Sequence, residues 1–339
     1  MREEHLPLPT GTVAVLIPCY NEEQTIGKVV DDFRRELPGA TVWVYDNNSD
    51  DATARIAKEH GAHVRHESRQ GKGNVVRQML RDIDADCYLM VDGDDTYPAE
   101  AASDLVRPVL LGRADHVVGD RLSNGTYGSE NNRQFHGFGN SLVRHLIRWL
   151  YGFDYADVMT GYRAMSRPFA RTYPVLSPGF EIETELSIHA VDKHWRIEQI
   201  PIEYRDRPEG SFSKLNTFSD GMRVLRMILS LFKDYRPFPF FGLLAIVALV
   251  LCLALGLPVV VEFSRSGLVE RFPTAVLAMG LGLLSALMLA IGLVLDTEVK
   301  SSRRSWELAC GDAFREDARL RADSRRRNIR ADMEDAAGS

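Results

Sequence analysis

The chain has few cysteines, and their spacing indicates neither a metal site nor a redox site. The four are scattered over 339 residues, at Cys19, Cys87, Cys252 and Cys310. Zinc and dithiol sites need pairs at short, regular spacing. We therefore expect free thiols, a reducing compartment and no structural disulfide.

Features typical of nucleic-acid-binding and NAD-binding proteins are also missing. The net charge is −6, and no basic stripe with interleaved aromatic residues occurs, so we expect no nucleic acid partner. No Gly-x-Gly-x-x-Gly follows the first apolar segment at 12–18, which argues against an NAD site. The polar start and the shortness of that apolar segment argue against a signal peptide. We expect residues 1–235 to lie in the cytoplasm.

Charged residues are absent from two long stretches, Phe240 to Val261 and Phe272 to Leu295. Roughly 20 apolar residues cross a bilayer core of about 30 Å. The sequence therefore predicts a transmembrane hairpin at about 239–261 and 273–295. Basic residues flank both spans on their outer sides, which places both termini in the cytoplasm of a multi-pass cell-membrane protein; these are Arg223, Arg226, Lys233, Arg236, Lys300, Arg303 and Arg304.

Residues 13–119 alternate between strand-like and helix-like segments. Short β-branched segments predict strands at 12–18, 41–46, 62–66, 86–92 and 115–121. Helical spacing between them is clearest over Ile26–Phe33 and Val76–Ile83. This alternation is typical of an α/β fold with a mostly parallel, doubly wound sheet.

The later part of the chain is less regular. We expect helices at about 136–152 and 181–193, strands at 160–167 and 196–205, and a loop over 206–221 that is rich in Gly, Ser, Pro and Asp. Basic residues on one face and apolar residues on the other predict an amphipathic helix lying in the membrane interface. A helix packed on the globular domain is the alternative. The predicted parts are a catalytic domain (1–215), this helix (216–237), the hairpin (238–296) and a charged cytoplasmic tail (297–339), which is a possible homo-oligomer contact.

Three carboxylates, Asp92, Asp94 and Asp95, follow an apolar strand in the sequence LMVDGDDTYPAE. Ligands of doubly wound sheets bind beyond the carboxyl ends of the strands. Two carboxylates spaced Asp-x-Asp can share a hard divalent cation whose shell is completed by phosphate oxygens and water. A freely solvated loop is the alternative for the cluster taken alone.

Eight motifs occur in order along residues 11–236: IPCYNEE, VYDNNSDDAT, RQGKG, VDGDDTYP, GDR, DVMTGYRAMSR, PGFEIETEL and RPEGSFSK. Together they resemble glycosyltransferase family 2, and within it the dolichyl- or polyprenyl-phosphate sugar synthases that carry a C-terminal transmembrane hairpin. The resemblance implies a GT-A fold and an inverting, metal-dependent transfer of a hexose from a nucleotide sugar to a polyprenyl phosphate at the cytoplasmic membrane face.

The resemblance also implies a donor site. Its nucleotide-sugar-binding positions are Pro18, Tyr20, Asn21, Glu22, Asp46, Lys72, Asp92, Gly93 and Asp94. Asp92 and Asp94 would hold Mg²⁺ or Mn²⁺, with Asp94 the principal ligand. The chain has Asn47 where relatives often have a second Asp, and Thr96 where some have Gln.

The acceptor side is implied in the same way. Asp94, Asp157 and Arg121 are the expected catalytic residues, with helix capping or a turn as the alternative role of Asp157. The expected acceptor- and phosphate-binding residues are Arg133, Arg163, Arg207, Ser213 and Lys214. Gly137 replaces a serine of the family.

Two other functions fit parts of the sequence. A processive polysaccharide synthase would carry a Gln-x-x-Arg-Trp motif and more spans, and a catalytically silent nucleotide-sugar-binding scaffold would not need Asp92, Asp94 and Lys214 together. UDP-glucose or a UDP-N-acetylhexosamine is the expected donor, with GDP-mannose next.

Overall fold

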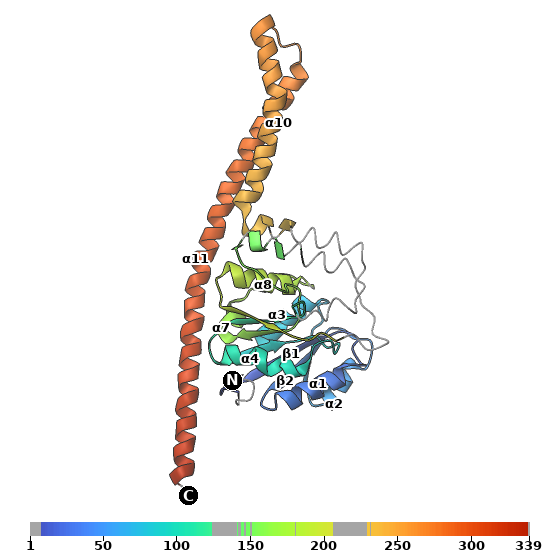
Figure 1. Ribbon diagram of the computed structural model, residues 1–339, viewed down its shortest axis with the longest axis vertical. Helices are drawn as coiled ribbons and strands as arrows, with labels where there is room; N and C mark the ends of the chain where they lie inside the picture. The colour runs from blue at the N-terminus through green and yellow to red at the C-terminus, as the bar shows by residue number, and fades with distance from the viewer. Residues whose placement is uncertain are drawn as a thin grey trace. The chain divides into compact units, whose positions relative to one another are not determined.

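A seven-stranded sheet in the order β3-β2-β1-β4-β6-β5-β7 is the centre of the fold (Figure 1). The structure is a computed structural model, and the residues described from it are 8–123, 141, 144–145, 147–149, 151–179, 181–205, 229–230 and 232–337. The strands are β1 (Val13–Cys19), β2 (Thr41–Asp46), β3 (His63–His66), β4 (Cys87–Met90), β5 (His116–Asp120), β6 (Arg163–Ser166) and β7 (Ile197–Pro201).

All strand pairs are parallel except those of β6, which runs antiparallel to both β4 and β5. The α/β, mostly parallel sheet of the sequence prediction is thus confirmed. The reversed direction of β6 was not predicted. Met90 of β4 and Val118 of β5 both pair with Arg163, the first residue of β6. The loop that enters β6 therefore lies at the edge where β4 and β5 end.

Helices cover both faces of the sheet (Figure 1). On one face, α1 and α4 pack on the alternate residues Val13, Val15, Ile17 and Cys19 of β1; α3 and α7 lie on the other face. Each large aliphatic side chain removed from water in this core contributes about 1.5–3 kcal/mol. Among the described residues, the helices around this sheet include α1 (Ile26–Glu36), α2 (Thr53–Glu59), α3 (Lys72–Asp82), the short 3₁₀ helix η2 (Ala99–Ala101), α4 (Ala102–Leu110), α7 (Arg167–Thr172) and α8 (Ile182–Asp192).

The two predicted helices between the first strands agree with the structure. Ile26, Val29, Val30 and Phe33 are all buried on α1, and the helix expected over 136–152 is helical at its described positions between 141 and 151. Helices α4 and α7 were not predicted. Pro108 lies inside α4 and removes a backbone donor there.

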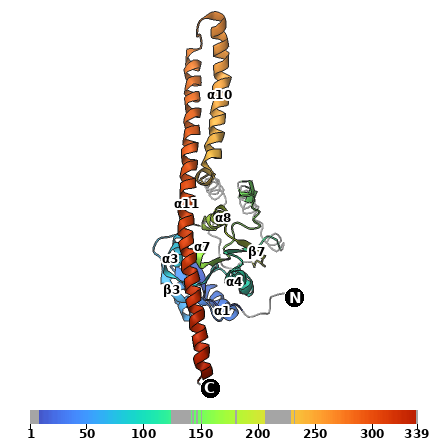
Figure 2. The ribbon, with the colours of Figure 1, turned by 90° about the vertical axis from the view of Figure 1, so that its left-hand side faces the viewer.

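Two long helices, α10 (Pro237–Ser266) and α11 (Phe272–Ala337), contain the predicted spans. The chain divides into two compact units, Met1–Thr217 with Leu308–Ser339, and Phe218–Glu307. Within the second unit α10 and α11 lie side by side (Figure 2). The hydroxyl of Ser285 donates to the carbonyl of Ala245 at 2.8 Å, and a Cβ on Gly282 would lie 3.3 Å from the sulfur of Cys252. Small residues permit this close approach of membrane helices.

Both helices are long and apolar enough to cross a membrane, over Pro237–Ser266 and Phe272–Leu320. Only 17% of the most apolar window of each is buried within the structure, whereas the core helix of a soluble protein is mostly buried. Most of the predicted amphipathic helix, 216–228, lies outside the described residues; residues 229–230 and 232–235 are helical.

Candidate active site

The described site residues lie at or just after the carboxyl ends of β1, β2, β4 and β5, at the start of α3, or in and before the reversed strand β6. Backbone hydrogen bonds connect the first of these loops. The amide of Asn47 donates to the carbonyl of Cys19 at 2.9 Å, and the amide of Glu67 donates to the backbone carbonyl of Asp46 at 2.9 Å. Because neighbouring parallel strands end at one edge, residues far apart in the sequence are brought together there.

The loop after β1 is held against the loop after β2. Asn21 has a positive φ of 53°; its amide donates to Ser49 Oγ at 2.9 Å, and its side-chain oxygen accepts from the amide of Asp50 at 2.9 Å. The amide of Glu22 donates to Thr53 Oγ1 at 2.8 Å. Asn21 thus shapes the loop that carries Tyr20 and Glu22, directly after Pro18 and Cys19 of β1.

Asp46, one of the expected nucleotide-sugar-binding residues, is buried at the end of β2. Its Oδ2 accepts from the amide of Ser49 at 3.3 Å and lies 3.4 Å from His66 Nδ1. Its Oδ1 is buried and has no hydrogen-bond partner among the described residues. A buried acceptor of this kind is costly unless a ligand supplies a donor.

Asn47 holds the loop between β3 and α3 through its side chain. Its amide nitrogen donates to the carbonyls of Glu67 at 2.8 Å and Arg69 at 2.9 Å, and its oxygen accepts from the amide of Gly71 at 2.7 Å. An aspartate could not make the first two bonds, because a carboxylate has no donor. The asparagine therefore has a structural role in positioning Gly71 and Lys72.

We expect Asn47→Asp to weaken donor binding about 10-fold, because it sets a carboxylate against two carbonyls at a cost of about 1–3 kcal/mol. Titration with UDP and thermal unfolding would measure the effect. Asn48→Asp is the matched control, since Asn48 also donates to a neighbouring loop, but through hydrogen bonds that are exposed to solvent. It has a positive φ of 63° that Asp tolerates. Equal behaviour of the two variants would contradict the role of Asn47.

The two glycines beside Lys72 are required by close backbone packing. A Cβ on Gly71 would lie 2.2 Å from the carbonyl oxygen of Pro178, and one on Gly73 would lie 1.9 Å from that of Ser177. Glu185 of α8 holds the opposing segment by accepting from the amides of Leu176 at 2.9 Å and Ser177 at 2.7 Å. The glycines thus seat Lys72 against this segment.

Lys72 forms an ion pair with two carboxylates. Its Nζ donates to Asp92 Oδ1 and, at 2.6 Å, to Glu183 Oε1 of α8. Burial opposes the charged form of Lys72, but the carboxylates of Asp92 and Glu183 outweigh it and raise the pKa of the ammonium above its usual value. Burial raises the pKa of the Glu183 carboxyl, and Lys72 opposes that shift.

The loop after β4 holds its aspartates in different environments. Asp94 is only 5% exposed, and its Oδ1 accepts from Thr96 Oγ1 at 2.6 Å and from the amide of Thr96 at 3.3 Å. The Asp92 side chain is 28% exposed. Asp95 pairs with Lys28 at 2.7 Å, and a Cβ on Gly93 would lie 2.8 Å from the sulfur of Cys19. Lys72 and Lys28 thus neutralise part of the negative charge of the three neighbouring aspartates.

Arg121 and Asp157, both expected to be catalytic, form one ion pair. Arg121 Nε donates to Asp157 Oδ2 at 2.6 Å and Nη2 donates to Oδ1 at 3.2 Å. Asp157 is fully buried, and its Oδ1 also accepts from the amide of Met159 at 3.1 Å. Both carboxylate oxygens are thus occupied. Asp157 is therefore suited to orient Arg121 and to stabilise the turn at Met159, and not to abstract a proton. A role in a turn was the alternative considered for Asp157.

The expected phosphate contact of Arg163 does not agree with its position. Arg163 is 0% exposed, and its guanidinium donates to the carbonyls of Thr160 at 2.9 Å and Val158 at 2.6 Å. Because it satisfies carbonyls inside the protein, it stabilises the loop before β6. Arg133, Arg207, Ser213 and Lys214, the other expected acceptor residues, lie outside the described residues.

Three residues at this edge were not assigned from the sequence: Glu183, Glu185 and Tyr97. All residues of α8 are buried, so its glutamates need partners inside the protein. The available signal in the sequence was the presence of three acidic residues in the EIETEL motif. Tyr97 adjoins the Asp-x-Asp motif, but its contacts are with residues distant in sequence.

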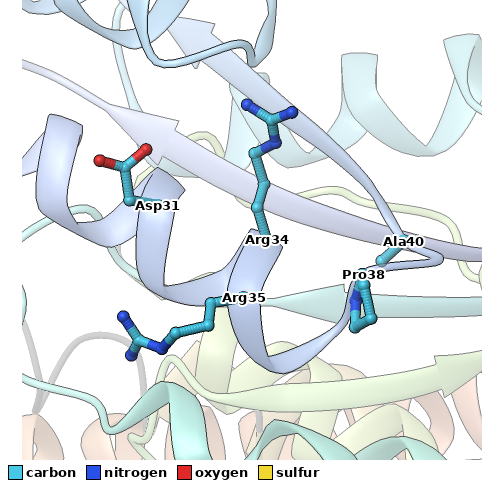
Figure 3. Close-up of a pocket in the computed structure, with 5 residues that line it drawn as sticks. All are labelled: Asp31, Arg34, Arg35, Pro38 and Ala40. Atoms are coloured by element: carbon cyan, nitrogen blue, oxygen red, sulfur yellow. The ribbon is translucent and has the colours of Figure 1, made fainter.

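A separate surface depression of about 420 Å³ is lined by Asp31, Arg34, Arg35, Pro38 and Ala40 (Figure 3). It lies where α1 ends and β2 begins, at the opposite edge of the sheet from Asp92. Its arginines already have partners: Arg34 donates to the carbonyl of His60 at 2.6 Å, and Arg35 pairs with Asp32 at 2.7 Å. We assign no function to it.

Comparison with known proteins agrees with this geometry. Residues 14–172 match the model of glycosyl transferase family 2. The chain is 34% identical over 259 residues to "Glycosyltransferase AglJ" of Haloferax volcanii, covering 76% of this chain and 84% of that protein. It is 31% identical over 224 residues to "Dolichyl-phosphate hexose transferase" of the same organism, covering 66% of this chain and 95% of that protein.

Among solved structures, glucosyl-3-phosphoglycerate synthase from Mycobacterium tuberculosis, in complex with Mn²⁺, UDP and glucosyl-3-phosphoglycerate, has the same fold. The TM-score is 0.52 at 24% identity, and the match covers 66% of this chain and 79% of that one. The chain has the GT-A fold and belongs to glycosyl transferase family 2.

Proposed function

We propose that the protein transfers a hexose from a nucleoside diphosphate sugar to a polyprenyl phosphate at the cytoplasmic face of a membrane, with inversion at the anomeric carbon. The observation that carries the proposal is the grouping of Asp92, Asp94, Lys72 and Arg121 at one edge of the sheet. The two long apolar helices and the dolichyl-phosphate named in one relative support the lipid acceptor.

Asp92 and Asp94 fit a divalent cation as a partial ligand set. Carboxylate oxygens are the donors that Mg²⁺ and Mn²⁺ prefer. In the part of the chain that the structure describes, no cluster of three or more His, Cys, Asp or Glu side chains could hold a metal ion alone. Diphosphate oxygens of the donor would therefore complete the shell, and the cation would neutralise the leaving diphosphate.

The chain's own residues then divide between the two substrates. Asp46 would accept a hydrogen bond from the base through its unpartnered Oδ1, and Lys72 would place a positive charge beside the diphosphate. Arg121, oriented by Asp157, would contact the phosphate of the acceptor. Arg163 would act only by holding the loop before β6.

The acceptor does not need a strong general base. A phosphate monoester has its second pKa near 6, so its oxygen is already largely anionic at neutral pH. Positioning and charge neutralisation would supply most of the acceleration, as in phosphoryl transfer. This agrees with a carboxylate at Asp157 whose two oxygens are occupied.

Transfer of radiolabelled sugar by the full chain in membranes tests the proposal. We expect label from a UDP-hexose, UDP-N-acetylhexosamine or GDP-mannose to enter an organic-extractable lipid from which mild acid releases it. Release of the nucleoside diphosphate should require Mg²⁺ or Mn²⁺ and stop with chelator. Label in a polymer, or no transfer from any donor, would overturn the proposal.

A further inference from the structure

Tyr97 packs against Arg121 together with a second tyrosine. The guanidinium carbon of Arg121 lies 5.8 Å from the centre of the Tyr97 ring and 5.3 Å from that of Tyr204. The two rings are 5.8 Å apart, edge to face. Cations within about 6 Å of an aromatic ring are attracted to it. Two rings and the carboxylate of Asp157 therefore restrict the orientation of Arg121.

The hydroxyl of Tyr97 makes a different contact. It accepts from the amide of Gly161 at 2.8 Å. Gly161 borders Asp92 so closely that a Cβ there would lie 2.5 Å from Asp92 Oδ2. The Tyr97 hydroxyl thus holds in place the Gly161 backbone that lies against the Asp92 carboxylate. Gly161 has no side chain that could fix its own distance from Asp92.

One side chain therefore touches both halves of the site. The ring of Tyr97 contacts the arginine on the acceptor side, and its hydroxyl contacts the backbone beside the carboxylate on the donor side. We propose that Tyr97 is a positioning residue that couples the two: its hydroxyl sets donor and cation binding through Gly161, and its ring, with that of Tyr204, sets acceptor use through Arg121. This rests on the proposed function.

Tyr97→Phe tests the hydroxyl, and Tyr88→Phe is its matched control. Both tyrosines are buried, with exposed fractions of 4% for Tyr97 and 0% for Tyr88. The Tyr88 hydroxyl also accepts from a backbone amide, that of Ala85 at 3.1 Å, and Tyr88 lies on β4, outside the site. Both variants leave a buried amide without its acceptor, so both should lower the melting temperature similarly. Only Tyr97→Phe should raise the Kd for UDP with Mn²⁺, by about 3- to 10-fold.

Tyr204→Leu tests the ring contact. It removes one of the two rings at Arg121 and leaves the Tyr97 hydroxyl in place. We expect kcat/KM for the lipid acceptor to fall about 10-fold, with the Kd for UDP and Mn²⁺ unchanged. Tyr97→Leu should show both defects.

Equal UDP affinity in Tyr97→Phe and Tyr88→Phe would overturn the role of the hydroxyl. Proportional losses of donor affinity and acceptor kcat/KM in Tyr204→Leu would overturn the division between ring and hydroxyl. Either result with normal transfer by the wild-type chain overturns this inference alone. Absence of transfer by the wild type would overturn it together with the proposed function.

Discussion

Replacing Asp94 by asparagine should reduce turnover by about 10²- to 10³-fold with either Mg²⁺ or Mn²⁺. The neutral amide is a weaker ligand for a divalent cation at a site that lacks a complete ligand set without the donor. Asparagine suits the test better than alanine, because Asp94 is buried and bonded to Thr96. The amide oxygen can still accept both Thr96 hydrogen bonds, so the fold should be retained.

Asp95→Asn is the control for this variant. It removes one charge from the same loop, but from an ion pair with Lys28 whose lysine side chain is 53% exposed. Such pairs contribute about 0–1 kcal/mol, and asparagine tolerates the positive φ of 59° at this position. Turnover should stay near the wild-type value. Near-normal turnover of Asp94→Asn, after chelation and return of the metal, would contradict the metal assignment.

Replacing Lys72 by methionine should abolish activity and destabilise the protein. The lysine and Glu183 side chains are each only 8% exposed, and removing one partner of a buried ion pair costs about 3–5 kcal/mol. For a domain of this size, that corresponds to a fall in melting temperature on the order of 10 °C. The loss arises because the carboxylates of Asp92 and Glu183 lose their shared ammonium group.

The double variant Lys72→Met/Glu183→Gln separates stability from activity. The neutral amide removes the unpaired buried charge, so most of the fall in melting temperature should be recovered. Turnover should stay low, because the positive charge beside the diphosphate is still missing. Thermal unfolding and release of nucleoside diphosphate measure the two effects. A single variant that melts like the wild type, or a double variant no more stable than the single one, would show that the pair is not coupled.

The residues of the donor side could be named from the sequence, but their environments could not. The motif order placed Asp46, Lys72, Asp92 and Asp94 together, and the structure puts them at one edge of the sheet. The motif order did not show that Asp94 is buried or that Lys72 bridges Asp92 and Glu183. These two residues are 20 and 111 positions away from Lys72 in the sequence. The roles of these residues in binding remain predictions.

Local features account for what was predicted correctly. The charge-free stretches that became α10 and α11, the alternation of strands and helices, and the carboxylate cluster after β4 each depend on neighbours within about 20 residues. Composition and periodicity report such features directly. The family resemblance added the GT-A fold, which the comparisons confirm.

The sequence by itself determined the class of fold, the two apolar helices and the polar character of the strand ends. Only the tertiary structure decided that β6 runs antiparallel, so that Gly161 borders Asp92 and Asp157 pairs with Arg121, and that Arg163 is turned inward to backbone carbonyls. The physical reason is that an ion pair or a strand direction depends on which segments share an edge of the sheet. Hydrophobic pattern requires that a segment be buried, but it does not specify the partner against which it is buried.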